Sequence, residues 1–475
     1  MSEHRMTIDG QSVDADEYFD VVNPATEEVV GRAPRCGPDQ LDLALAAARR
    51  AADGPWSRDL DQRRAALSRA AKVVEEALGD ISTLLTLEQG KPLADSMAEL
   101  IGAVIWLQHF ADLPLPGPEV GGDAGCRTEL HRHPLGVVAA ITPWNVPVVL
   151  ACWKIAPALL AGNTVVVKPS PYTPLSTLLL IQRLQAAFPP GVLSVVSGGD
   201  ELGAALTRHP VPRKITFTGS VATGRKVLEA AAHDLKRVTL ELGGNDAGIV
   251  LDDADVDAVA DALFWGAFYN TGQACVAIKR LYVPERLHDP IVDALAGIAA
   301  DVVVGDGMQP GVRLGPLNNA PQLNRVTELV DEALAGGASA VVGAEVREDR
   351  GFYYPVTLLT GARADMRVVA EEQFGPVLPI LPYSDVEEAI SSANATSYGL
   401  GGSVWGSDTD RAAQIAGRLR CGTAWVNAHM ALGPEQPFSG WHDSGYGTEN
   451  GLLGYHEFTQ AQLVRTPKAD APAPW

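Results

Sequence analysis

A cysteine in the stretch 268-FYNTGQACVAIKR-280 lies in a setting that a structural thiol does not need. Cys275 follows a helical run, 255–270, and a turn that contains glycine. The thiolate is the reactive form of cysteine, and cationic neighbours or backbone dipoles can lower the thiol pKa from about 8.5. Backbone N–H groups at such a turn can also stabilise an oxyanion on a substrate bound to the sulfur. The setting indicates a nucleophile, although a lone cysteine is more often a buried small hydrophobe.

Two further polar side chains directly follow apolar runs of strand type. Glu241 ends the run in 240-LELGGND-246, and Asn145 stands in 142-TPWNVPVV-149. Catalytic groups of open α/β sheets gather at the carboxyl ends of strands, so Glu241 is placed to activate water and Asn145 to donate to an oxyanion. Taken alone, Glu241 is also compatible with a surface or helix-capping carboxylate, and Asn145 with a turn former.

Two other segments have the composition of a nucleotide site. The segment 217-FTGSVATG-224 is a glycine-rich turn from strand to helix without the full GxGxxG spacing, and it offers a helix N-terminus to a pyrophosphate. Lys168, in 167-VKPSP-171, ends another strand and can either hydrogen-bond ribose hydroxyls or remain solvated.

These residues require a sheet that brings strand ends together, and the sequence predicts one. Short continuous apolar runs alternate with helical stretches, which is typical of parallel strands covered on both faces. The predicted fold class is therefore α/β, with a Rossmann-like doubly wound domain and a second α/β domain. The runs of the first series are 136–142, 164–170, 193–198, 214–219 and 237–244, and those of the second are 247–251, 281–283, 339–343 and 376–381.

Composition excludes several classes of function. The chain has 475 residues and a net charge of −21, which disfavours nucleic acid and anionic membranes as partners. Its five cysteines form no CxxC pair, which argues against a disulfide framework or a structural metal site. The polar N-terminus shows no signal peptide, and no apolar segment reaches the roughly 20 residues of a membrane span. We expect a reduced, cytoplasmic protein.

Six motifs in order, TPWN, KPSP, FTGS, LELGG, NTGQAC and EEQFGPV, resemble the aldehyde dehydrogenase superfamily of NAD(P)-dependent enzymes. The resemblance extends from 21-VVNPATEEVVG-31 and 87-LEQGKP-92 to 436-QPFSGWHDSGYG-447. It implies a dinucleotide-binding domain at 1–112 and 134–243 and a catalytic domain at 244–455. It also implies an oligomerisation element at 113–133 and 456–475, and hence a homodimer or homotetramer.

The resemblance assigns roles to individual residues. Cys275 resembles the nucleophile and Glu241 the general base, while Asn145 and the backbone N–H of Cys275 resemble the oxyanion hole. Lys154 and Glu449 match an auxiliary proton path of some members. The predicted cofactor contacts are Thr142, Trp144, Lys168, Ser170, Pro171, Gly203, Phe217, Gly219, Ser220, Gly243, Glu372 and Phe374.

One departure from the family concerns the cofactor. The family commonly has Glu where this chain has Pro171, and that Glu accepts hydrogen bonds from the adenosine ribose and repels a 2′-phosphate. NAD is the expected cofactor, and NADP is not excluded.

The family positions that line the substrate tunnel are apolar or aromatic and include no arginine. A second carboxylate on the substrate would normally need a fixed cation, so we expect an uncharged aliphatic or aromatic aldehyde. Betaine aldehyde, held by cation–π contact, is the weaker option. The predicted pocket consists of Val146, Leu150, Trp153, Tyr269, Val276, Leu432 and Phe438.

The predicted reaction is oxidation of this small-molecule aldehyde to its acid through a thiohemiacetal and a thioester on Cys275. Three alternatives stay open: a CoA-acylating enzyme, an NAD-independent thiol esterase and a catalytically silent relative. Retention of Glu241 favours water over CoA as the acyl acceptor.

Overall fold

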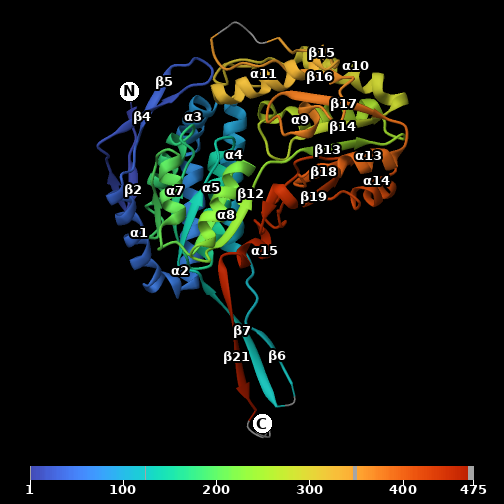
Figure 1. The fold of residues 1–475 in the computed structure, drawn as a ribbon. Coiled ribbons are helices and arrows are strands. Elements are labelled where there is room, and N and C mark those ends of the chain that lie inside the picture. The colour runs from blue at the N-terminus through green and yellow to red at the C-terminus, as the bar shows by residue number, and fades with distance from the viewer. Residues whose placement is uncertain (1, 124, 346–349, 469–475) are drawn as a thin grey trace.

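The computed structural model describes residues 2–123, 125–345 and 350–468, which form two α/β bodies and a projecting arm (Figure 1). The first body is built on an eight-stranded sheet in the order β20-β12-β11-β8-β9-β10-β2-β3, whose middle strands are parallel. These strands are β20 (Gly445–Tyr446), β12 (Arg237–Glu241), β11 (Lys214–Thr218), β8 (Val137–Ile141), β9 (Thr164–Lys168), β10 (Leu193–Val195), β2 (Met6–Ile8) and β3 (Gln11–Val13).

The direction of the crossovers decides where ligands can bind to this sheet. From β8 the chain advances through β9 to β10, and it then returns through β11 to β12 on the other side of β8. Because such crossovers are right-handed, α5 (Pro147–Leu160) and α6 (Leu175–Leu184) cover one face and α7 (Asp200–Arg208) and α8 (Val221–Ala232) the other. The order therefore reverses between β8 and β11, which is where doubly wound sheets bind ligands.

The buried strands explain why the sequence shows continuous apolar runs. Every residue of β8, β9 and β11 is buried, as expected for strands with helices on both faces. Helix α5 is buried over nearly its whole surface, and it begins at Pro147, a position where proline removes no helical hydrogen bond. The helices between β3 and β8 are α1 (Pro38–Ala52), α2 (Leu60–Glu76), α3 (Leu78–Gln89) and α4 (Leu93–Asp112).

The second body is built on a seven-stranded sheet in the order β15-β16-β17-β14-β13-β18-β19. Successive residues of β13, Ile249 and Val250, belong to different apolar clusters, so both faces of this sheet are covered. Its strands are β13 (Asp246–Val250), β14 (Ile278–Pro284), β15 (Ser339–Val342), β16 (Thr357–Thr360), β17 (Val377–Tyr383), β18 (Gly401–Trp405) and β19 (Thr423–Val426). Its helices are α9 (Val256–Phe268), α10 (Glu285–Asp301), α11 (Ala320–Ala335), α12 (Arg367–Ala370), α13 (Val386–Ala393) and α14 (Thr409–Ala416).

The arm is a three-stranded antiparallel sheet that projects from the first body (Figure 1). It joins β6 (Glu119–Gly122) and β7 (Cys126–Pro134) to β21 (Thr459–Pro467), which follows α15 (Gly451–His456). A smaller sheet, β1-β5-β4, lies near the N-terminus. Its strands are β1 (Ser2–Glu3), β5 (Val29–Pro34) and β4 (Tyr18–Val22).

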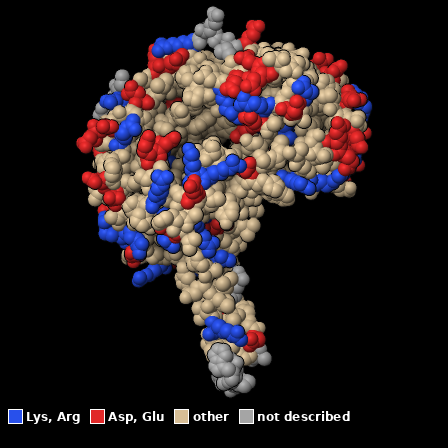
Figure 2. All heavy atoms as spheres, in the orientation of Figure 1, with Lys and Arg blue, Asp and Glu red and all other residues tan. Residues whose placement is uncertain are grey.

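The predicted α/β fold class is confirmed, whereas the domain boundaries and the oligomerising role of the arm stay predictions. Residues 124 and 469–475 of the predicted oligomerisation element lie outside the described residues. The face drawn in Figure 2 carries acidic and basic side chains interspersed rather than a broad field of one sign. No helix in the described part of the chain is both long enough and apolar enough to cross a membrane.

Candidate active site

A cavity of about 1230 Å³ lies along the carboxyl ends of the strands of the first sheet and reaches Cys275. Its position matches the reversal of strand order between β8 and β11. Residues that are far apart in the sequence meet there, and every residue predicted for catalysis or cofactor binding lines this one cavity. They are Cys275, Glu241, Asn145, Thr142, Trp144, Lys168, Ser170, Pro171, Gly203, Phe217, Gly219, Ser220, Gly243, Glu372 and Phe374.

Cys275 is half-buried on the loop between a one-turn helix, η2 (Tyr269–Gly272), and strand β14. Asn270 and Thr271 have left-handed backbone angles, with φ of 51° and 58°, which turn the chain sharply after α9. Gly272 also has positive φ, and a Cβ there would overlap the backbone of Gly375. The turn thus packs the cysteine loop against the segment that carries Glu372 and Phe374.

The Cys275 sulfur is held as a thiol in the free protein. Burial raises its pKa well above the usual range, and the negative charge of Glu241 raises it further. The positive charge of Lys279 opposes this rise. The Lys279 Nζ donates to the carbonyl of Ala274, the residue before Cys275, at 2.6 Å. A thiol of raised pKa has to lose its proton to a base before it can attack.

Glu241 is the last residue of β12 and is only 3% exposed. Among the described residues, no group meets either of its carboxylate oxygens with full hydrogen-bond geometry. Burial raises the pKa of Glu241 to about 8, the adjacent Cys275 thiol lowers it, and the neighbouring carboxylate of Glu449 adds to the rise. A carboxylate with free acceptor capacity and a pKa near neutrality has the properties of a general base.

Asn145 follows β8 and is 4% exposed. Its Nδ2 donates to the Gln273 carbonyl at 3.0 Å, which fixes one of the two N–H groups of the amide. The second N–H has no acceptor among the hydrogen bonds of the described residues, and Asn145 lines the cavity together with Cys275. This geometry allows the amide to donate to an oxyanion that forms next to the sulfur.

The opposite end of the cavity fits a dinucleotide. Helix α8 begins there with its first-turn N–H groups, and the Ser220 side chain caps the helix by accepting from Thr223 N. Gly219 beside it has to be glycine, because a Cβ there would overlap the Phe217 ring. The N–H groups at the start of α8 offer a binding site for a pyrophosphate.

Lys168 is buried at the end of β9, so the alternative that it is solvated is wrong. Burial lowers the pKa of Lys168 to about 8, while Asp200 and Glu201 act in the opposite direction. Its Nζ donates to the Pro169 carbonyl at 3.2 Å and keeps further N–H groups for a ligand. Glu372 lies near the catalytic end and accepts from Gly244 N at 3.0 Å, and burial raises the pKa of Glu372 to about 7.

Lys154 and Glu449, which are far apart in the sequence, form a buried ion pair. The Lys154 Nζ lies 2.5 Å from Glu449 Oε1 and donates to Thr218 Oγ1 at 2.7 Å. The charge of Glu449 raises the pKa of Glu241, and the charge of Lys154 lowers it. The two residues predicted for a proton path therefore meet beside the candidate base.

Comparisons with known proteins bear on the identity of this site. The sequence profile of the aldehyde dehydrogenase family matches residues 11–464. The chain belongs to the aldehyde dehydrogenase family. It is 38% identical to phenylacetaldehyde dehydrogenase of Pseudomonas fluorescens over 97% of this chain and 95% of that relative. It is also 35% identical to betaine aldehyde dehydrogenase of Bacillus subtilis (strain 168) over 98% of each.

A solved structure shows the same aldehyde dehydrogenase fold. The crystal structure of an NAD-dependent aldehyde dehydrogenase from Sinorhizobium meliloti superposes with a TM-score of 0.97 at 35% identity. The match covers 100% of this chain and 96% of that one. The predicted family and fold are thereby confirmed.

The residues predicted for the aldehyde pocket do not line the large cavity. All except Tyr269 belong to, or pack against, the apolar cluster that also contacts Cys275. Within it, the Trp153 ring stacks on Trp106 with centroids 5.0 Å apart and meets Phe438 edge-on at 5.6 Å. Cys275 therefore contacts two different regions, the apolar cluster and the large cavity proposed for the cofactor.

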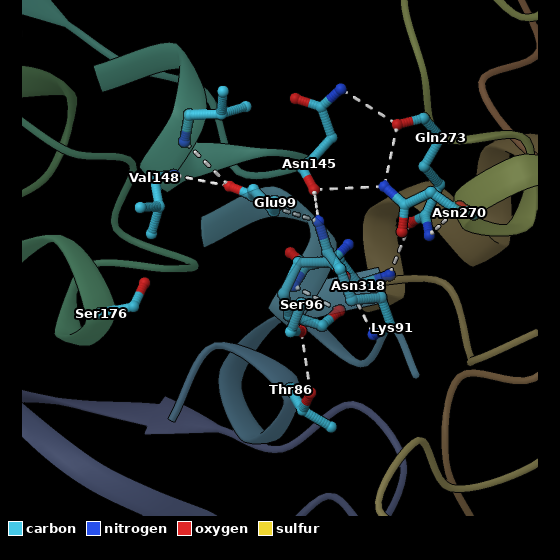
Figure 3. A network of polar contacts seen from close by, with 12 residues as sticks. Thr86, Lys91, Ser96, Glu99, Asn145, Val148, Ser176, Asn270, Gln273 and Asn318 are labelled. Carbon is cyan, nitrogen blue, oxygen red and sulfur yellow. Dashed lines mark hydrogen bonds and ion pairs between the residues drawn. The ribbon is translucent and has the colours of Figure 1, made fainter. Parts of the chain in front are cut away.

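Sequence reasoning missed several polar residues around the site. Gln322, Arg325 and Tyr398 line the cavity, but no local pattern in the sequence distinguishes them. Lys91 stands in the motif 87-LEQGKP-92, which marked the family but suggested no role for this residue. It contacts Asn145 together with Asn270 in a buried polar network (Figure 3). Among the described residues, no group of His, Cys, Asp and Glu is arranged to hold a metal ion.

Proposed function

We propose that the protein uses NAD to oxidise an uncharged aldehyde to its carboxylic acid, with Cys275 as the nucleophile. The observation that carries the proposal is the meeting of Cys275, Glu241 and Asn145 at one end of a cavity whose other end fits a dinucleotide. The solved relative from Sinorhizobium meliloti is described as NAD-dependent, which supports NAD as the cofactor.

In the first half of the reaction, Glu241 accepts the thiol proton and the Cys275 sulfur attacks the aldehyde carbon. The negative charge then develops on the former carbonyl oxygen. The free N–H of the Asn145 amide, with the backbone N–H of Cys275, stabilises this oxyanion because the donors are already oriented. When bound through Lys168, Ser220 and Glu372, NAD supplies the acceptor for the hydride.

In the second half, a thioester on Cys275 is hydrolysed. Once the proton taken from Cys275 has left, the Glu241 carboxylate takes a proton from water, for which it has free acceptor capacity. That proton has to leave the buried Glu241 before the next turnover. The adjacent Lys154–Glu449 pair supports a route outward, because Glu449 Oε2 is also without a hydrogen-bond partner among the described residues.

An uncharged aliphatic or aromatic aldehyde is the substrate class that the apolar side of Cys275 supports best. The side chains packed on that side of Cys275, among them Trp153 and Phe438, are apolar, and the predicted pocket includes no cation for a second carboxylate. The name of the relative from Pseudomonas fluorescens, phenylacetaldehyde dehydrogenase, agrees with this class. Betaine aldehyde is the second candidate, because the relative from Bacillus subtilis is named for it and aromatic faces bind quaternary ammonium groups.

The arm supports a homo-oligomer. Val120, Leu463 and Val464 expose 63%, 65% and 38% of their surface on β6 and β21, in a sheet that has little core of its own. Exposed apolar residues on neighbouring strands are typical of a surface that a partner covers. A homodimer or homotetramer would cover them.

An aldehyde panel tests the proposed function. Purified protein is mixed with phenylacetaldehyde, hexanal, betaine aldehyde and succinic semialdehyde, each with NAD or NADP, and reduced nicotinamide is followed by absorbance. We expect the highest kcat/KM with NAD and an uncharged aldehyde. Parallel assays with CoA distinguish hydrolysis from acyl transfer, and absence of reduced nicotinamide with every aldehyde would overturn the proposal.

A further inference from the structure

A second buried Lys–Glu pair lies directly behind Asn145 (Figure 3). Lys91 stands in the short connection between α3 and α4, and Glu99 is in α4. Lys91 Nζ lies 2.6 Å from Glu99 Oε2, and the two side chains are 0% and 1% exposed. Neither residue lines the large cavity, so neither is placed to contact the cofactor there.

Both members of the pair bind the segment that carries Asn145. Lys91 Nζ donates to the Asn145 carbonyl at 2.7 Å. Glu99 Oε1 accepts from Val148 N at 2.7 Å and from Val149 N at 3.2 Å, which are free donors in the first turn of α5. Charge-assisted hydrogen bonds of this kind are short and directional, so the pair fixes the segment on both sides of Val146.

The same segment is also fixed to the cysteine loop. Asn270 Nδ2 donates to the Asn145 carbonyl at 3.1 Å and to the Gln273 carbonyl at 3.2 Å. Asn145 Nδ2 donates to the same Gln273 carbonyl at 3.0 Å. The direction of the remaining Asn145 N–H therefore depends on where the Asn145 backbone is held, and Lys91 supplies the only charged donor to its carbonyl among the described residues.

We propose that Lys91 and Glu99 are positioning residues, which hold the Asn145 amide in the orientation that stabilises the oxyanion at Cys275. The inference deepens the proposed function and rests on its assignment of Asn145. Small displacements of an oriented donor are enough to slow a reaction strongly, because the donor has to meet the charge as it develops. Loss of the pair should therefore slow steps that form an oxyanion while other chemistry of the same thiol is retained.

The test uses Lys91→Met/Glu99→Gln, which removes both charges together. A single substitution would leave one buried charge unpaired and risk unfolding, whereas neutral replacement of a whole buried pair is often tolerated. Two reactions of Cys275 are then measured without cofactor. Acylation by p-nitrophenyl acetate passes through a tetrahedral oxyanion, whereas alkylation by iodoacetamide forms none.

We expect the acylation rate of the double variant to fall about 10- to 100-fold and the alkylation rate of Cys275 to stay within about twofold. Mass spectrometry of the alkylated protein identifies Cys275 among the five cysteines. Equal loss in both reactions would mean that the pair only maintains the structure around the thiol, and unchanged acylation would mean that it does not position Asn145. Either result would overturn the inference.

A matched control is Lys214→Met/Glu457→Gln. Lys214 is also fully buried and lies 3.3 Å from Glu457, whose side chain is 27% exposed, and neither residue lines the cavity or contacts Asn145. This control should change neither rate by more than about twofold. If it slows acylation as much as the Lys91→Met/Glu99→Gln variant, the effect is general to ion pairs of a buried lysine and the inference fails.

A double-mutant cycle with Asn145→Ala makes the test specific. If the pair acts through the Asn145 amide, Lys91→Met/Glu99→Gln should slow acylation by less than about twofold once that amide is gone. If the losses in acylation rate from Asn145→Ala and from Lys91→Met/Glu99→Gln multiply when combined, the inference is overturned. Neither probe reaction needs an aldehyde or NAD, so failure of the aldehyde panel would contradict the proposed function without deciding this test.

Discussion

Two buried Lys–Glu pairs flank the candidate site, and they differ in what their atoms contact. In the Lys91–Glu99 pair, both carboxylate oxygens accept hydrogen bonds and the ammonium also donates to the Asn145 carbonyl. In the Lys154–Glu449 pair, Glu449 Oε2 has no hydrogen-bond partner among the described residues. Both carboxylate oxygens of the first pair are therefore hydrogen-bonded, whereas one carboxylate oxygen of the second pair is free.

The Lys91–Glu99 pair contacts the candidate oxyanion donor, and the Lys154–Glu449 pair lies beside the candidate base. A carboxylate with both oxygens hydrogen-bonded to the ammonium and to backbone N–H groups holds those groups in place. A carboxylate with a free oxygen can bind water or exchange a proton. The difference fits the roles proposed for the two pairs, which are positioning for Lys91–Glu99 and proton movement for Lys154–Glu449.

The largest effect should come from removing the Cys275 sulfur, the candidate reacting atom that lies between the two pairs. Cys275→Ala should reduce aldehyde oxidation and ester hydrolysis by roughly 10³-fold or more, because no other nucleophile lies in that loop. NAD binding, measured by quenching of tryptophan fluorescence, should persist. The controls Cys36→Ala, Cys126→Ala and Cys421→Ala should retain activity. Substantial turnover in Cys275→Ala would show that Cys275 is not the nucleophile.

Glu241→Gln should give the next largest effect, on deacylation more than on acylation. Rapid mixing with aldehyde and NAD should release about one equivalent of reduced nicotinamide per site, followed by turnover that is slower by about 10²- to 10⁴-fold. Loss of the initial burst as well would mean that acylation depends on Glu241 as strongly as deacylation does. Full steady-state turnover would exclude it as the base.

The pH dependence should distinguish the two pairs. Glu241 acts as a base only when ionised, and burial raises its pKa to about 8, so kcat should rise with pH through a midpoint near 8 and level off above it. Glu449 raises the pKa of Glu241 and Lys154 lowers it. Glu449→Gln should therefore move the midpoint of kcat to lower pH and lower the plateau by about 10-fold.

The Lys91→Met/Glu99→Gln variant should leave that midpoint where it is and should show no burst, because its slow step precedes the thioester. Stopped-flow measurements of both variants between pH 6 and pH 10 make the comparison. If the two variants shift the midpoint equally, the distinction between a positioning pair and a proton-handling pair is wrong.

The smallest effect on NAD turnover is expected at Pro171, which lines the cavity but contacts neither pair. Pro171→Glu supplies an anionic acceptor for the ribose hydroxyls and places like charge against a 2′-phosphate. The ratio of kcat/KM for NAD over NADP should rise about 10-fold, mostly through NADP. An unchanged ratio would show that position 171 does not face the adenosine ribose.

The strands and the candidate catalytic residues could be predicted because their signals are local. Continuous apolar runs marked β8, β9 and β11, since strands buried on both faces have to be apolar throughout. Cys275, Glu241 and Asn145 each stand in a short motif directly after a turn or a strand. Residues 456–475 were predicted to form one oligomerisation element with 113–133, but the sequence did not indicate that β21 pairs with β7.

The sequence alone was therefore sufficient to predict the fold class, the family and the candidate residues of the reaction. Which charged side chains meet follows from the packing of the folded chain. Lys154 and Glu449 come from distant parts of the chain, and Lys91 reaches Asn145 across the interior of the first body. No local pattern encodes such contacts. A buried charge is tolerated only where the folded chain supplies its partner, and that partner is fixed by how helices and sheets pack rather than by its position along the sequence.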